Sequence, residues 1–135
     1  MVSYGIVGKV KGLFDQTVAK VRDALKGEGF GVITEINVQK TVKEKLGEHR
    51  LPYLILGACN PSLAHRAIAA EPEIGLLMPC NVCIWEDPDG AITVAAVDVE
   101  ALFQLVQNPS LADVAAAVND KLRRVIKEVT TREGS

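Results

Sequence analysis

Residues 51–86, LPYLILGACNPSLAHRAIAAEPEIGLLMPCNVCIWE, decide the fold, because a strand, a helix and the start of a hairpin follow one another in this stretch. Residues 51–59 are almost continuously apolar, which is typical of a strand in the middle of a sheet. Asn60 is a favoured residue for the position before a helix, and Pro61 fits the first turn, where its missing N–H costs nothing. The stretch therefore predicts a strand that ends at Cys59 and an alanine-rich helix that follows at once.

The hairpin that comes next has the clearest turn in the chain. Residues 81–86 (NVCIWE) and 91–97 (AITVAAV) are both of strand length, and DPDG lies between them. Pro88 presets one turn dihedral, and Gly90 allows a conformation that other residues avoid. We therefore expect an antiparallel pair of strands joined by this turn.

The N-terminal part of the chain predicts two strands and two helices in alternation. Residues 3–10 and 30–36 alternate in polarity as strands do. Between them, Asp15 is expected to cap a helix that ends at Gly27, with an inward stripe of Val18, Val21 and Leu25. A short helix is expected from Asn37, its cap, to Leu46, with a solvated lysine-rich face.

The C-terminal part predicts a long amphipathic helix. Ser110 and Asp113 resemble a capping box, and apolar residues recur at helical spacing from there to residue 129. Asp98 is expected to cap a further helix after the hairpin, and residues 130–135 to form a disordered tail. No linker or repeat interrupts the chain, so its 135 residues are interpreted as a single domain.

The composition excludes several classes of partner. Fifteen Lys and Arg residues against 17 Asp and Glu residues give a formal net charge of −2, which argues against nucleic acid as a ligand. The N-terminus lacks the pattern of an export signal, and no apolar run is long enough to span a membrane. Three cysteines, an odd number, favour reduced thiols over a disulfide scaffold. We therefore expect a soluble, cytoplasmic protein.

The cysteines are the residues with most chemical potential. Cys59 lies directly before a helix N-terminus, where the helix dipole favours a thiolate but burial opposes it. Cys80 and Cys83 form a Cys-x-x-Cys, yet in a strand they point to opposite faces, about 10 Å apart at Cα, which is too far for a disulfide. A zinc site would need a tight turn and a second pair of ligands. Packing, ligand binding and redox chemistry all remain open for Cys59, whereas Cys83 is interpreted as a core residue.

Residues 42–90 also carry a family resemblance. KEKLG (43–47), ACNP (58–61), EP (71–72) and GLLMPCN (75–81) match motifs of the family known as domain of unknown function 302, which the chain closely resembles over nearly its whole length. The resemblance implies a compact α+β domain, with helices packed on an antiparallel sheet, similar in topology to half of the TATA-binding protein. It also implies a homodimer. The positions that match the family pattern are Lys45, Cys59, Asn60, Pro61, Glu71, Pro72, Pro79, Cys80 and Asn81.

Two functions of different class fit these residues. The first is a non-catalytic, homodimeric binding or interaction domain that holds a small molecule, a metal or haem at the end of the sheet with Cys59 and Cys80. The second is a thiol enzyme or redox sensor in which Cys59 is the nucleophile and Cys80 resolves it. A structural interpretation, in which both cysteines only pack, is the third. No constellation points to a catalytic residue or a metal ligand, and the candidate ligand-binding residues are Cys59, Asn60, Cys80, Asn81 and Lys45.

Overall fold

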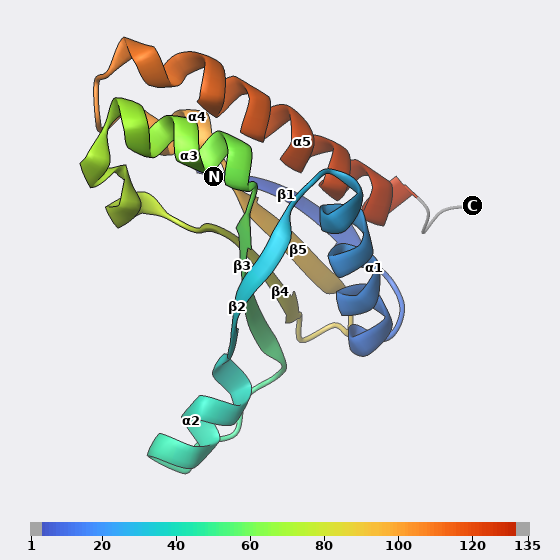
Figure 1. The fold of residues 1–135 in the computed structure, drawn as a ribbon. Coiled ribbons are helices and arrows are strands. Elements are labelled where there is room, and N and C mark those ends of the chain that lie inside the picture. Colours follow the sequence, from blue (N-terminus) through green and yellow to red (C-terminus); the bar gives the residue numbers. More distant parts are fainter. Residues whose placement is uncertain (1–3, 132–135) are drawn as a thin grey trace.

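The computed structural model describes residues 4–131, which form strands, α-helices and 3₁₀-helices (Figure 1). The elements in chain order are β1 (Gly5–Val10), α1 (Phe14–Gly27), β2 (Gly31–Asn37), α2 (Val38–Leu46), β3 (Tyr53–Cys59), α3 (Pro61–Ala70), the 3₁₀-helix η1 (Pro72–Leu77), β4 (Cys80–Glu86), β5 (Ile92–Val97), α4 (Val99–Phe103), the 3₁₀-helix η2 (Pro109–Leu111) and α5 (Ala112–Thr131).

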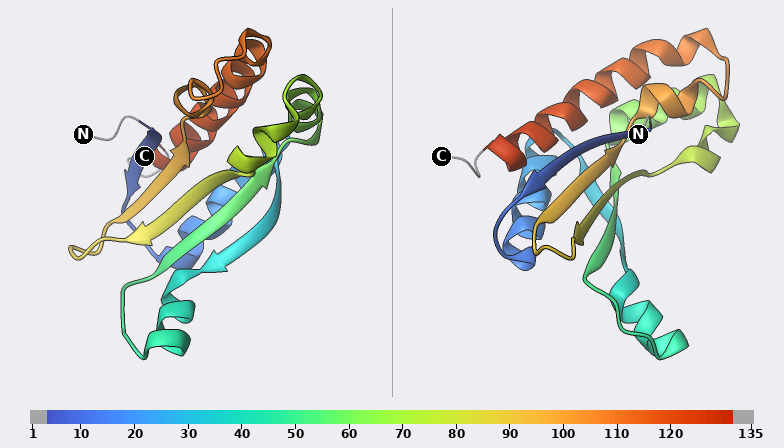
Figure 2. Two further views of the ribbon diagram at one scale, coloured as in Figure 1. Left: turned by 90° about the vertical axis from the view of Figure 1, so that its left-hand side faces the viewer. Right: turned by 180° about the vertical axis from the view of Figure 1, so that it is seen from behind.

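The five strands form one antiparallel sheet in the order β1-β5-β4-β3-β2. Helices α1 and α5 pack on the same face of this sheet, α3 and α4 lie at one end, and α2 projects beyond the other end (Figures 1 and 2). One hydrophobic core lies between the sheet and α1 and α5. The predicted α+β class, with helices on an antiparallel sheet, is confirmed.

Side-chain alternation divides every strand between two faces of the sheet. Leu56, Val82 and Val94 point to the helices and are fully buried. The residues that alternate with these along each strand point to the other face. No helix within residues 4–131 covers that face (Figure 2, left). An antiparallel sheet commonly has one covered face, but here both faces are largely apolar.

Three of the expected helix caps are confirmed. The side-chain oxygens of Asn37, Asn60 and Asp98 accept hydrogen bonds from the backbone N–H groups of Lys40, Leu63 and Ala101, at 2.9, 3.2 and 3.0 Å. Each side chain satisfies a backbone donor that the first helical turn leaves without a partner.

Two expected caps are wrong, and the expected tail is placed to start too early. Helix α1 already begins at Phe14, so Asp15 lies inside its first turn, and Leu13 occupies the cap position without a side-chain hydrogen bond. Ser110 lies in η2, where Asn108 accepts from its N–H, and α5 begins only at Ala112. Helix α5 also continues to Thr131, so the expected tail begins two residues too early, and residues 132–135 lie outside the described part of the chain.

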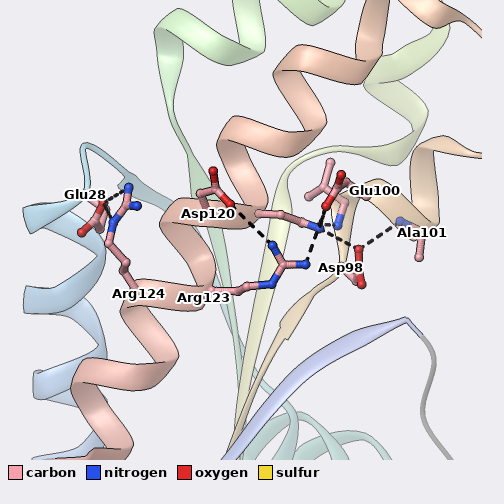
Figure 3. Close-up of polar contacts among 9 residues, drawn as sticks. Glu28, Asp98, Glu100, Ala101, Asp120, Arg123 and Arg124 are labelled. Atoms are coloured by element: carbon pink, nitrogen blue, oxygen red, sulfur yellow. Dashed lines mark hydrogen bonds and ion pairs between the residues drawn. The ribbon is translucent and has the colours of Figure 1, made fainter.

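A buried asparagine joins α5 to the start of α4. The Asn119 side chain is fully buried, its oxygen accepts from the Val99 N–H at 2.8 Å, and its nitrogen donates to Asp98 and Glu100 at 2.8 and 2.9 Å. Burial raises the pKa of Asp98, but the hydrogen bonds from Ala101 and Asn119 outweigh it, so that the pKa lies below its usual value. Neighbouring ion pairs, Glu100 with Arg123 and Glu28 with Arg124, bridge α5 to other elements (Figure 3).

We expect Asn119→Ala to lower the free energy of unfolding by about 2–3 kcal/mol, because it leaves the Val99 N–H buried without its acceptor. Urea denaturation followed by circular dichroism measures the change. Asp120→Ala is the matched control on the same helix, because its side chain is 65% exposed, and it should change the stability by less than about 0.5 kcal/mol. Equal effects of the two variants would contradict a structural role for the Asn119 contacts.

Gly8 permits the close approach of α5 to β1. A Cβ atom at Gly8 would lie 2.3 Å from Cγ2 of Thr130 and 3.1 Å from Cγ2 of Ile126. We therefore expect Gly8→Ala to destabilise the protein by about 1–3 kcal/mol through overpacking, as measured by urea denaturation. Gly27→Ala is the control, because nothing lies within 4 Å of its added Cβ, and it should leave stability unchanged or slightly increased. A tolerated Gly8→Ala would show that α5 can shift away from the sheet.

Candidate functional site

A cavity of about 260 Å³ lies at the end of the sheet where β3 stops and β4 starts. Helix α3 forms one wall of the cavity, and the end of η1 with residues 78–79, α4, one face of α5 and the start of β2 contribute to the others. Its lining is apolar except for the ends of three side chains, Cys59, Asn60 and Cys80. The apolar lining consists of Phe30, Ile33, Ala58, Leu63, Ala64, Ala67, Ile68, Leu77, Met78, Pro79, Val99, Phe103, Val114 and Val118.

Strand pairing brings the two candidate cysteines to this cavity. β3 and β4 are antiparallel neighbours, and Ala58 lies opposite Cys80 in their register, so Cys59 and Cys80 lie at the same sheet end. Both cysteines are half-buried and are among the residues that line the cavity. Their convergence, expected if the two strands were neighbours, is confirmed, and their role in binding stays a prediction.

The Asn60 side chain uses its oxygen to cap a helix, and its nitrogen is a second polar group that can donate a hydrogen bond. Its oxygen caps α3, while no hydrogen bond of its side-chain nitrogen is found within residues 4–131. Gly29, with a φ of 84°, lies beside this nitrogen, since a Cβ at Gly29 would come within 3.1 Å of it. Asn60 is also one of the residues that line the cavity.

A β-bulge adds a wall residue that sequence reasoning missed. The register of β2 against β3 shifts between Val32 and Thr34, so Ile33 is an extra residue without a partner. It is 62% exposed and lines the cavity. Bulges re-aim single side chains, and no sequence signal other than an imperfect apolar alternation could have indicated this one.

Two candidate residues are not brought to the cavity. Asn81 is exposed and pairs with Gly57, and it points to the uncovered face of the sheet because it follows Cys80 by one position. Lys45 lies on α2, at the opposite end of the sheet from α3 (Figure 1). Cys83 likewise faces away from Cys80, so the expected separation of the Cys-x-x-Cys thiols onto opposite faces is confirmed.

The electrostatics of the cavity favour neutral groups. Burial, and to a smaller extent the neighbouring Cys59, raise the pKa of Cys80 to about 11, so this thiol is protonated at neutral pH. Within residues 4–131 no cluster of three or more His, Cys, Asp or Glu side chains is arranged to hold a metal ion. A protonated Cys80 is a poor metal ligand. It would also be slow to attack an oxidised Cys59 as the resolving thiol, which weighs against the redox hypothesis.

Because its pKa is raised, Cys80 should react slowly with iodoacetamide. At neutral pH it forms about a hundredfold less thiolate than a cysteine with the ordinary value of 9.0, and its labelling rate should rise with pH until about pH 11. Peptide mapping by mass spectrometry after timed labelling measures the rate, and the same chain in urea is the reference. Labelling of folded Cys80 at pH 7 as fast as in urea would show that its thiol is neither buried nor perturbed.

The chain resembles proteins of one family along nearly all of its length. It is 23% identical over 125 residues to an "Uncharacterized protein" of Aquifex aeolicus, covering 90% of this chain and 81% of that one. Its fold matches the crystal structure of an uncharacterized conserved protein from Bacillus stearothermophilus, with a TM-score of 0.88, 23% identity and coverage of 95% and 99% of the two chains. The family model described as "Domain of unknown function DUF302" matches residues 7–129, and the chain belongs to this family.

Proposed function

We propose that the protein is a non-catalytic, homodimeric binding domain of the cytoplasm, and that its cavity takes the uncharged, apolar part of a small molecule. The observation that carries this proposal is the apolar lining of the cavity, in which Cys59, Asn60 and Cys80 are the polar residues. Ligand sites are typically concave and apolar with a few placed polar groups, and this cavity has that character.

The cavity volume limits the size of the ligand. A cavity of about 150 Å³ lined by Leu, Ile and Phe holds a benzene molecule. By proportion, the 260 Å³ here suits a group of about ten non-hydrogen atoms. Of the ligands expected from the sequence we retain the small molecule, because the apolar lining suits the apolar part of one.

The polar groups of the cavity suit a ligand with one neutral polar atom. The Asn60 side-chain nitrogen can donate a hydrogen bond to a hydroxyl or carbonyl oxygen. The protonated thiol of Cys80 is a soft, polarizable surface against which an alkyl chain or an aromatic ring packs well. A charged group would lose its hydration there without gaining an ion pair, because no lysine, arginine, aspartate or glutamate lines the cavity.

The free thiols support a reducing compartment. All three cysteines are free, and each is half-buried, as expected for a protein of the cytoplasm. No helix within residues 4–131 is both long and apolar enough to cross a membrane.

Binding of 1-octanol, toluene and octanoate tests the proposal. Chemical-shift titrations by NMR should show saturable binding of octanol and toluene at residues around the cavity, with octanoate at least tenfold weaker because of its charge. Native mass spectrometry of the purified protein gives an independent readout for a ligand that is retained from the cell.

Ala64→Phe should fill the cavity and weaken octanol binding by at least tenfold. Ala64 lines the cavity and is half-buried, whereas Ala69, on the same helix, is exposed and does not line it. Ala69→Phe is therefore the matched control and should bind octanol as the unmodified chain does. Equal binding by both variants, or no saturable binding of either uncharged probe, would overturn the proposal.

A further inference from the structure

The uncovered face of the sheet carries an unbroken apolar row. Val7 pairs with Ala95, Ala95 with Cys83, Cys83 with Ile55, and Ile55 with Ile36, so one residue from each of the five strands lies in line across the sheet. All five point away from the helices. Val7 and Ile36, at the two ends of the row, are 47% and 50% exposed.

Aromatic side chains extend the row toward the end of the sheet where α2 lies. Tyr53 and Trp85 pair across β3 and β4 and stack at 5.4 Å with an interplanar angle of 6°. The Arg50 guanidinium lies 5.1 Å from the centre of the Tyr53 ring. Trp, Tyr and Arg dominate the binding energy of protein interfaces, and an apolar patch that spans a sheet is uncommon on a monomer.

Two segments of opposite charge flank the aromatic end of this face. Residues 38–50 carry the basic Lys40, Lys43, Lys45 and Arg50 against two glutamates, whereas residues 86–89 carry Glu86, Asp87 and Asp89. Asp87 already forms an ion pair with Lys9, so the acidic charge toward a partner comes mainly from Glu86 and Asp89. Both segments lie at the end of the sheet opposite α3, the first beside the β2 edge and the second between β4 and β5 (Figure 1). Helix α2 has no buried residue of its own.

We propose that the uncovered face is closed by the same face of a second copy, related by a two-fold axis that is parallel to the strands and runs between the two faces, over Cys83 of the central strand β4. This rotation exchanges the two ends of the apolar row, so Val7 of one copy meets Ile36 of the other and Cys83 lies opposite itself. It brings the sheet ends that carry α2 in the two copies to the same end of the dimer. It also turns the basic residues 38–50 of each copy toward the acidic residues 86–89 of the other. The inference rests on the proposed homodimer and adds its surface and symmetry.

The physical reasons for a second copy are shape and complementarity. Two twisted sheets can pack face to face about 10 Å apart with their strands nearly aligned, as this axis requires. The small side chains of Ala95 and Cys83 lie between larger ones at the centre of the row, which allows the two sheets to interlock. About this axis the apolar row and the charged segments both meet complementary groups of the second copy, as an isologous interface requires.

Light scattering coupled to size-exclusion chromatography tests the surface. The unmodified chain should have twice its 14.5 kDa, and Val7→Glu or Ile36→Glu should shift it to a monomer at micromolar concentration by placing charges in the apolar row. Leu105→Glu is the matched control, because Leu105 is 76% exposed and follows α4, away from this face, and it should stay dimeric. Circular dichroism shows whether each variant is folded.

Cross-linking tests the axis without altering the row. In a Cys59→Ser/Cys80→Ser chain, Cys83 is the remaining cysteine, and a short bismaleimide should join two copies through it at concentrations where an otherwise identical Cys83→Ser chain gives no product. A monomeric unmodified chain would overturn both the dimer and this surface. A dimer that survives Val7→Glu and Ile36→Glu and gives no Cys83 cross-link would overturn the surface alone, and octanol binding would be unaffected by either outcome.

Discussion

The pairing of β3 with β4 is the constraint on which the rest of the structure depends. It holds the centre of the sheet together, and its register determines which side chains share a face. Because Ala58 lies opposite Cys80, the chain segments on either side of α3 and η1 return to one point, and a cavity forms between them. The same register sends Cys83 and Trp85 to the other face. The register of β3 with β4 thus decides which side chains line the cavity and which lie on the uncovered apolar face.

Local signals in the sequence predicted the elements well, because caps and turns depend on a few neighbouring residues. Asn37, Asn60 and Asp98 cap helices as expected. Asp15 and Ser110 do not, because the turns before them already form: Leu13 accepts from Thr17, and Asn108 closes η2. A residue's capping propensity is not enough when its neighbour starts the helix earlier.

The site could be predicted only in part, because its walls are distant in sequence. Motifs indicated Cys59, Asn60 and Cys80, which all line the cavity, but nothing local distinguished Cys80 from Asn81, one residue later on the opposite face. The 51–59 segment predicted a central strand, and β3 is next to the centre of the sheet. Its continuous apolar character is usually a sign of burial on both faces, whereas here only one face is covered by helices. That difference depends on where α1 and α5 pack, which strand composition does not encode.

The β2 edge of the sheet has a consequence for solubility. An edge strand with free N–H and C=O groups is a template on which other chains can add and grow into fibrils. In β2 the bulge at Ile33 interrupts the regular spacing of these groups, and Glu35, which forms an ion pair with Arg22, places a charge along the edge. Ile33, which lines the cavity, therefore also interrupts the edge on which amyloid-like growth would start.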